Sequence, residues 1–376
     1  MQKYIDGISK TGYLFENDIA RILKNNKWQV ISNKYYIDDQ QETVREIDLI
    51  AYKCSTFGDF DVYTSLVISC KKSDSCIWGL LSRNINPNDP NTDFEPFHGW
   101  SNDKAICFGI NKEKFAKNYF KEGREANLAQ LFDSPSFDIF AFQEIDKAKG
   151  TPQNDKAIFS SITSLMKAQA YELSVLPERI KSKRRKPAIY QFNLISLVDT
   201  ELVRIIVGDQ VDDELVAMEV NNADYITRYI INGKETFARI RFLNAIDFEN
   251  QLDIYNKLHN FNCRFFKKEQ NEFYVDVLKS KEKRAIYEDD FSNELTSKLN
   301  SISYDEIKSS KFHINNIELG WNHRENHIWI DVDGEESMES SDFFNSNDES
   351  IKAAKELLLK YYRYDGNMKF SFAIPF

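Results

Sequence analysis

The sequence predicts a protein of the α/β (α+β) class, with a mixed sheet flanked by helices, an insertion, and an additional α+β C-terminal domain. Short apolar runs of strand length alternate with longer amphipathic runs of helical spacing. A chain of 376 residues that is 42% hydrophobic can also bury a large core and divide into two or three domains. We expect one domain over 1–263, with 80–150 as an insertion or lid, and a second over 264–376.

The first predicted helix covers residues 12–23. Phe15, Ile19 and Leu23 recur at helical spacing and form one apolar face. Glu16 lies at the margin of that face, which makes its carboxylate a candidate site residue.

Three predicted strands follow, over residues 28–31, 46–50 and 66–72. Side chains alternate between the two faces of a strand, so Glu46 and Asp48 project together while their apolar neighbours point to the core. Lys71 lies near the end of the third strand. Two neighbouring strands would therefore bring Glu46, Asp48 and Lys71 to one edge.

Carboxylates beside a lysine at adjacent strand ends suit metal-assisted hydrolysis of phosphodiesters. The acids would hold Mg²⁺ or Mn²⁺, which polarises the phosphate and lowers the pKa of a bound water. We predict Asp48 as the central metal ligand, with Glu46 and Glu16 as auxiliary acidic ligands. Lys71 would orient the water or offset developing charge, and all four are candidate catalytic residues.

Residues 12–72 resemble the PD-(D/E)xK (restriction-endonuclease-like) nuclease superfamily, and within it the bacterial Holliday-junction-resolvase-like proteins. The shared pattern is a helical Glu, then Glu-Ile-Asp-Leu-Ile at 46–50, then a hydrophobic strand ending in x-x-Lys. The resemblance implies a restriction-endonuclease-like sheet and a Mg²⁺- or Mn²⁺-dependent endodeoxyribonuclease, in bacterial restriction or phage defence. It also implies the backbone carbonyl of Cys70 as a metal ligand, and a polar residue from the next helix, where Lys167 and Gln169 are candidates.

One position departs from the family pattern. Ser69 stands where the family has the Glu of Glu-x-Lys, so a neutral hydroxyl replaces a charged ligand. In one interpretation Glu46 and Glu16 supply the missing charge. In the other, Ser69 marks lost catalysis, and the chain is an inactive nuclease-fold protein that binds nucleic acid or a partner. The two differ in whether three acidic groups converge within about 5 Å of one point.

The net charge of −10 argues against a generally basic surface, so any DNA contact must be local. One basic run offers such a contact through Lys181, Lys183, Arg184, Arg185 and Lys186. A solvated loop is the alternative interpretation of this run. The C-terminal domain could bind a protein partner, and the chain could form a homodimer.

The cysteine pattern and the N-terminus indicate the compartment. Five cysteines without a Cys-x-x-Cys pair argue against a disulfide framework or a zinc knuckle. The first residues do not resemble a signal peptide, and no apolar stretch is long enough to span a bilayer. We therefore expect a reduced, cytoplasmic protein without a membrane partner.

The remaining elements follow from periodicity and turn signals. Helices are expected over 112–132, 156–173 and 248–261, and strands over 137–142, 189–197, 202–207, 225–231 and 236–242, the last four completing the sheet. In the C-terminal region we expect a strand over 272–277, a hairpin over 317–321 and 327–332, a mobile acidic loop over 331–349, and a helix over 351–362.

Overall fold

The computed structural model describes residues 1–9, 11–39, 41–181, 186–208, 214–307, 313–334 and 337–372. The chain divides by compactness into two units. Residues 1–103 and 110–267 form the first, and residues 104–109 and 268–376 form the second. The sequence suggested a boundary between residues 263 and 264. In the structure the chain passes from the first compact unit to the second after Lys267, inside helix α7 (Phe248–Val275).

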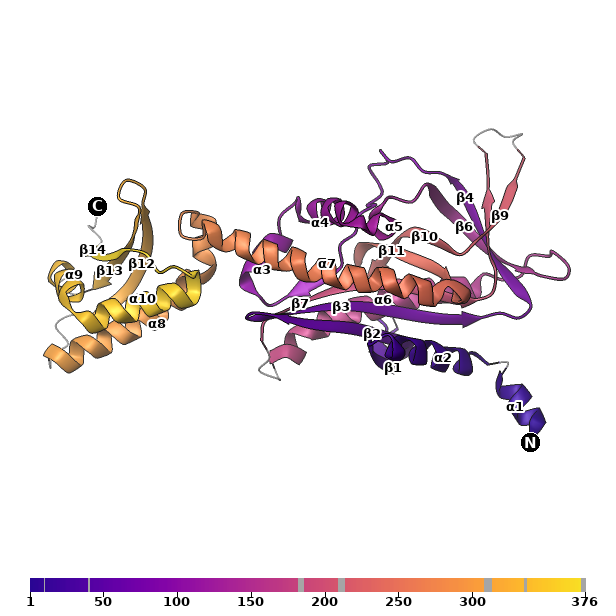
Figure 1. Cartoon of the computed structure of the whole chain (residues 1–376), viewed down its shortest axis with the longest axis horizontal. Coiled ribbons are helices and arrows are strands. Elements are labelled where there is room, and N and C mark those ends of the chain that lie inside the picture. Colours follow the sequence, from indigo (N-terminus) through magenta and orange to yellow (C-terminus); the bar gives the residue numbers. More distant parts are fainter. Residues whose placement is uncertain are drawn as a thin grey trace. The chain divides into compact units, whose positions relative to one another are not determined.

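A mixed sheet forms the centre of the first unit, in agreement with the predicted class (Figure 1). Within the described residues it has seven strands, in the order β1-β2-β3-β7-β11-β10, with the short β5 paired to β7. β3 is antiparallel to β2 and parallel to β7, so both pairing directions occur. The strands are β1 (Gln29–Ile37), β2 (Val44–Phe57), β3 (Phe60–Lys72), β5 (Gly99–Ser101), β7 (Ala188–Asp199), β10 (Asn222–Ile231) and β11 (Lys234–Asn244).

Helix α6 (Lys156–Lys181) covers one face of this sheet. Ile50, Val67 and Leu194 are cross-strand neighbours, so their side chains share a face. All three belong to the buried cluster that α6 joins through Leu165. Asp48 is two residues from Ile50, and therefore lies on the α6 side of the sheet.

Helix α7 covers the opposite face. His259 Nδ1 lies 3.0 Å from the hydroxyl of Thr64, a β3 residue whose side chain points away from that of Val67. Helices α1 (Gln2–Ser9) and α2 (Gly12–Asn25) precede the sheet. α2 buries Ile19 and Leu23, as its apolar spacing predicted.

Strands from near the two ends of the predicted insertion lie in a second sheet. Its order among the described residues is β6-β4-β8-β9, from β4 (Cys76–Asn84), β6 (Phe137–Asp146), β8 (Leu202–Ile206) and β9 (Val216–Val220). The expectation that residues 202–207 complete the main sheet is therefore wrong. Leu202 pairs in parallel with Trp78 of β4, and both side chains are fully buried in the cluster that α6 joins, so this pairing contributes to the core.

The single helix expected over 112–132 is broken. In this range the chain forms α4 (Phe115–Gly123), a π-helical turn η1 (Arg124–Leu128) and α5 (Ala129–Phe132), and the short helix α3 (Lys104–Ile110) precedes them. Asn127 has a φ of 63°, a left-handed conformation that an α-helix cannot contain. The apolar spacing persists across this break, which is why periodicity alone did not locate it.

The second unit contains α8 (Lys281–Ile307), α9 (Ser337–Ser346), α10 (Asp348–Tyr362) and a sheet of β12 (Ile314–Asn322), β13 (His327–Gly334) and β14 (Met368–Phe372). The predicted hairpin is confirmed as β12 and β13. The predicted strand over 272–277 is wrong, because α7 continues to Val275. The buried residues Phe266, Gln270 and Phe273 recur at helical spacing, and this longer pattern outweighs the short alternation.

The acidic segment 331–349 is not a loop where the structure describes it. β13 extends to Gly334, and α9 and α10 follow. Phe344 on α9 is fully buried, and the side chain of Asn347 caps α10 by accepting the amide of Ser350. Burial of a few apolar side chains such as Phe344 therefore orders a segment whose acidic composition indicated a mobile loop.

Candidate functional site

The ladder between β2 and β3 ends at the pair Leu49 and Ile68. Just beyond it, Oδ2 of Asp48 accepts the backbone amide of Cys70 at 2.6 Å and the hydroxyl of Ser69 at 3.2 Å. A side chain therefore satisfies main-chain and side-chain donors where the ladder stops. This fixes one edge of the Asp48 carboxylate against β3.

Lys71 lies at the same strand end. Its Nζ is 3.6 Å from Asp48 Oδ2, and the two side chains are 27% and 20% exposed. The structure thus brings together two of the predicted site residues as a partly shielded ion pair, on the side of the sheet that α6 covers.

Glu16 reaches this group from α2. Its pKa is raised to about 7, chiefly by burial and then by the negative charge of Asp48, while Lys71 partly opposes both. Glu46 adds a smaller repulsion. Three carboxylates therefore act on one another around a single ammonium group, which leaves the site with an excess of negative charge.

Glu46 is the outermost of the four. It is exposed on β2, opposite Tyr35 of β1. Among the described residues it makes no hydrogen bond or ion pair. Its position on the Asp48 side of the strand leaves the carboxylate free to turn toward the site or toward solvent.

The described part of the chain holds no group of three or more His, Cys, Asp or Glu side chains placed to bind a metal ion. The criterion of three converging acids is therefore not met. Mg²⁺, however, commonly binds through one or two carboxylates, with water and substrate phosphates as the other ligands. Oδ1 of Asp48, which receives no donor from the described residues, and the carboxylate of Glu16 offer hard oxygen donors that fit such a site.

The direction of the Cys70 carbonyl follows from the hydrogen bond of its amide. In a β-strand the N–H and C=O of one residue point to the same side. Because the Cys70 amide donates to Asp48, the carbonyl of Cys70 also points toward β2 and away from β7. The thiol itself is buried, and burial holds its pKa well above the ordinary value, which disfavours the nucleophilic thiolate form.

The two candidates on α6 do not contact Asp48. Lys167 donates to both carboxylate oxygens of Asp38 at 2.9 Å in a buried ion pair. The side-chain amide nitrogen of Gln169 is buried and has no hydrogen-bond partner in the part of the chain that the structure describes. Both side chains are therefore part of the protein interior, at positions along α6 that are away from Asp48.

Sequence reasoning missed a serine pair beside the site. Ser161 Oγ on α6 lies 2.7 Å from Ser196 Oγ on β7, and Ser196 is the cross-strand partner of Ser69. All three serines are almost fully buried. The available signal was Ser161, a polar residue at a position of α6 where the helical pattern expects an apolar one. An analysis based on apolar spacing alone does not use such a residue.

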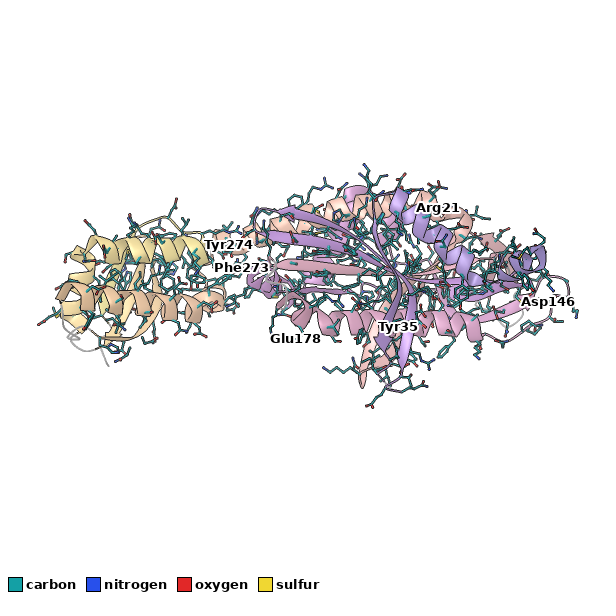
Figure 2. The ribbon with its side chains drawn as sticks, turned by 90° about the horizontal axis from the view of Figure 1, so that it is seen from below. Arg21, Tyr35, Asp146, Glu178, Phe273 and Tyr274 are labelled. Carbon is teal, nitrogen blue, oxygen red and sulfur yellow. The ribbon has the colours of Figure 1, made fainter. Side chains whose placement is uncertain are left out.

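Part of the predicted DNA-binding run, Lys183, Arg184 and Arg185, lies outside the described residues. Lys181 is exposed at the end of α6, 3.2 Å from Glu178. Figure 2 shows α6 extending from the neighbourhood of Asp146 to Glu178 at its far end. Ser161 and the site lie toward the first of these ends, so Lys181 is separated from Ser161 by about 30 Å of helix.

Lys186, at the other end of the basic run, also lies far from Asp48. Lys186 Nζ lies 3.3 Å from the carbonyl oxygen of Gly58, in the turn between β2 and β3. Along β2 the distance from Asp48 to Gly58 is about 33 Å at about 3.3 Å per residue. The structure therefore places both described ends of the basic run at the opposite end of the hairpin from Asp48.

No family model matches the chain, no curated protein is significantly similar to it in sequence, and no solved structure is significantly similar to its fold. No helix in the described part of the chain combines the length and apolar character that crossing a bilayer requires.

Proposed function

We propose that the chain is a Mg²⁺- or Mn²⁺-dependent endodeoxyribonuclease of the PD-(D/E)xK type, with its site formed by Glu16, Glu46, Asp48 and Lys71. The observation that carries this proposal is the ion pair of 3.6 Å between Lys71 and Asp48. Glu16 joins this pair from a separate helix, so residues far apart in sequence meet at one strand end. A role in bacterial restriction or phage defence rests on the family resemblance alone.

Asp48, Lys71 and Glu16 have different roles in this proposal. Asp48 is held in place by the Cys70 amide through Oδ2, which leaves Oδ1 to face a cation. Lys71 offers a positive charge beside that carboxylate, where it can orient water or offset the charge that develops on a phosphate. Glu16 retains a proton over part of the neutral pH range, because its pKa is about 7.

The excess negative charge supports the cofactor proposal. A bound Mg²⁺ or Mn²⁺ would polarise the phosphate and acidify a water. Asp48 and Glu16 would hold it, with Glu46 and the Cys70 carbonyl as additional oxygen donors. The same excess charge would repel DNA without a cation, so we expect binding of DNA at this end to require the metal.

A second candidate function has its own support. Asp48 Oδ2 already accepts the Cys70 amide and the Ser69 hydroxyl, and the described residues present no three-acid metal group. A nuclease-fold protein that binds nucleic acid or a partner without cleaving it would have such a site. In that case Asp48 would serve to tie β2 to β3.

One experiment separates the two. Purified full-length protein is incubated with supercoiled plasmid and with single-stranded DNA in Mg²⁺, Mn²⁺ or EDTA. We expect cleavage that needs the metal, and a loss of about 100-fold, ~2.7 kcal/mol, in Asp48→Ala. The matched control is Asp61→Ala, which removes an acid near the other end of the same strand pair, where its carboxylate accepts the hydroxyl of Thr56 at 2.7 Å.

Cleavage that persists in Asp48→Ala would overturn the assigned site. Metal-independent DNA binding by a wild type that cleaves neither substrate would favour the second candidate. Loss of cleavage in Asp61→Ala as well would indicate that damage to the hairpin, and not loss of a ligand, explains the Asp48 result.

A further inference from the structure

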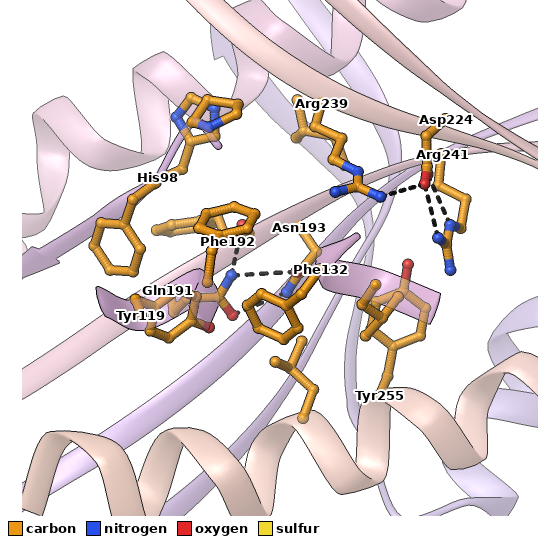
Figure 3. Close-up of a pocket in the computed structure, with 16 residues that line it drawn as sticks. His98, Tyr119, Phe132, Gln191, Phe192, Asn193, Asp224, Arg239, Arg241 and Tyr255 are labelled. Carbon is orange, nitrogen blue, oxygen red and sulfur yellow. Dashed lines mark hydrogen bonds and ion pairs between the residues drawn. The ribbon is translucent and has the colours of Figure 1, made fainter. Parts of the chain in front are cut away.

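A cavity of about 60 Å³ lies on the α7 side of the main sheet, within the first unit (Figure 3). Arg239 and Arg241 of β11 and Asp224 of β10 line it, together with aromatic side chains that include Phe132 and Tyr255. We call it the arginine cavity.

The arginine cavity is distinct from the candidate site. Arg241 pairs with Ile195, and Ile195 pairs with Ile68. Ile68 and Val67 are consecutive in β3, so their side chains lie on opposite faces. Asp48 shares the face of Val67, and the two sites are therefore on opposite sides of the sheet.

Positive charge exceeds negative charge in the arginine cavity. Asp224 accepts from Nε of Arg241 at 2.9 Å and from Nη2 of Arg239 at 2.5 Å (Figure 3). Burial raises the pKa of Asp224, but the two guanidinium groups outweigh burial and bring it to about 2. Arg204 is near enough for the charge of Asp224 to act on it as well. One carboxylate thus serves at least two arginines, and the remaining buried positive charge is unfavourable without an anion.

Unused donors accompany this charge. Arg241 is 4% exposed, and its Nη1 is buried without a hydrogen-bond partner among the described residues. Nη1 of Arg239 is likewise buried without a hydrogen-bond partner among the described residues. A buried N–H without an acceptor is unfavourable, more so when the group is charged, so both arginines favour an oxygen acceptor beside them.

His98 also lines the arginine cavity. Burial lowers its pKa to about 4, and a hydrogen bond to the backbone of Phe237 opposes that shift only in part. The ring is therefore neutral near pH 7, and its Nε2 has no partner among the described residues. A neutral imidazole can accept a proton donor such as the P–OH of a hydrogen phosphate.

The size of the cavity limits the ligand. A water needs about 10–15 Å³ of such space, so the cavity holds roughly four to six water-sized atoms. A tetrahedral oxyanion has a central atom and four oxygens, which matches this room, whereas a nucleoside does not fit. We propose that the arginine cavity binds a phosphate-type oxyanion through Arg239 and Arg241, either as free phosphate or as the terminal phosphate of a nucleotide.

Calorimetry on the full-length protein tests this proposal. Inorganic phosphate is titrated at pH 7 in a phosphate-free buffer whose ionic strength is held constant with NaCl. We expect saturable binding with one phosphate per chain. Arg241→Gln and Arg239→Gln should each weaken it about tenfold, ~1.4 kcal/mol. Arg228→Gln is the matched control on β10, because Arg228 is exposed and pairs with Glu235 outside the cavity.

The outcomes are distinct. Absence of saturable phosphate binding by the wild type overturns the proposal, and so does binding that neither cavity variant weakens. If Arg241→Gln fails to fold, the wild-type titration and Arg239→Gln remain decisive. A parallel titration with deoxyadenosine 5′-monophosphate identifies the source: tight, Arg241-dependent binding indicates a nucleotide phosphate, and binding of inorganic phosphate alone indicates the free ion. Neither result depends on DNA cleavage.

Discussion

The backbone amide of Cys70 donates a 2.6 Å hydrogen bond to Oδ2 of Asp48, at the point where the ladder between β2 and β3 stops. This contact joins the main chain of one strand to the side chain of the next. It orients the Asp48 carboxylate, and it turns the Cys70 carbonyl toward β2. The backbone of β3 therefore holds the Asp48 carboxylate in its position.

The first prediction concerns Ser69. Ser69→Ala removes one hydrogen bond of 3.2 Å and should lower the free energy of unfolding by about 1 kcal/mol. Ser69→Glu should lower it by about 1–3 kcal/mol, because the site is 1% exposed and cannot accommodate a larger side chain without strain. Urea denaturation measures both. The new carboxylate would also repel Asp48.

Metal titration by calorimetry completes this test. If Glu46 and Glu16 supply the acidic ligands, Glu46→Gln should weaken Mg²⁺ binding and Ser69→Glu should not improve it. Ser196→Ala is the control, because it removes a buried serine hydrogen bond that does not involve Asp48. An inactive wild type whose Ser69→Glu variant binds Mg²⁺ more tightly would indicate a decayed site.

The second prediction concerns the pH dependence of stability through Glu16, in EDTA. Its folded-state pKa of about 7 is above the ordinary 4.5, so the bound proton stabilises the fold. This contribution is fully present below about pH 4.5 and is lost as pH rises through about 7. Relative to Glu16→Gln, the wild type should therefore lose on the order of 1 kcal/mol between pH 4.5 and 8, after allowance for solvent screening.

Urea unfolding of both proteins across this pH range gives the difference curve. Asn17→Gln is the control, since it changes an exposed, uncharged neighbour on α2. A difference between wild type and Glu16→Gln that does not change with pH would contradict the raised pKa of Glu16.

The third prediction assigns Lys167 to the fold and not to catalysis. Lys167→Met leaves the carboxylate of Asp38 buried with fewer partners, and should cost about 3 kcal/mol of unfolding free energy. The double variant with Asp38→Asn should cost less than the sum of the two single changes, by about 0.5–3 kcal/mol. Chemical denaturation of the four proteins of the cycle measures this coupling.

Cleavage per folded molecule should be unchanged in Lys167→Met. Lys156→Met is the matched control, because Lys156 is exposed at the start of the same helix. A stable Lys167→Met protein that no longer cleaves DNA would place Lys167 in the site after all.

The fourth prediction concerns the basic run. Replacement of Lys183, Arg184, Arg185 and Lys186 by Ser should weaken DNA binding and reduce its dependence on salt, because fewer counterions are released. Lys186 contacts the far end of the β2–β3 hairpin from Asp48. The effect should thus be large for a duplex of about 30 base pairs and small for one of about 8, which spans only ~27 Å.

Fluorescence anisotropy at several salt concentrations measures the slopes. Four exposed lysines of the second unit, changed to Ser at Lys352, Lys355 and Lys360 on α10 and at Lys369 on β14, provide the control for net charge. An unchanged salt slope in the first variant would favour the solvated-loop interpretation of the run.

The sequence by itself determined the features that depend on local periodicity. A strand alternates its side chains whatever it pairs with, so Glu46 and Asp48 share a face before any partner is known. The helix of residues 12–25 likewise buries Ile19 and Leu23 because their spacing matches the helical turn. The mixed α/β class followed from the same patterns.

Tertiary structure decided which elements meet. Strand pairing depends on apolar surfaces that are distant in sequence, and for that reason β8 joins β4 and leaves the main sheet. The same non-local choice set the β2–β3 ladder to end beside Asp48. It also placed Asp224 opposite Arg241, through a register between β10 and β11 that no local pattern specifies. Periodicity predicts the face on which a side chain lies, but only packing decides what that face contacts.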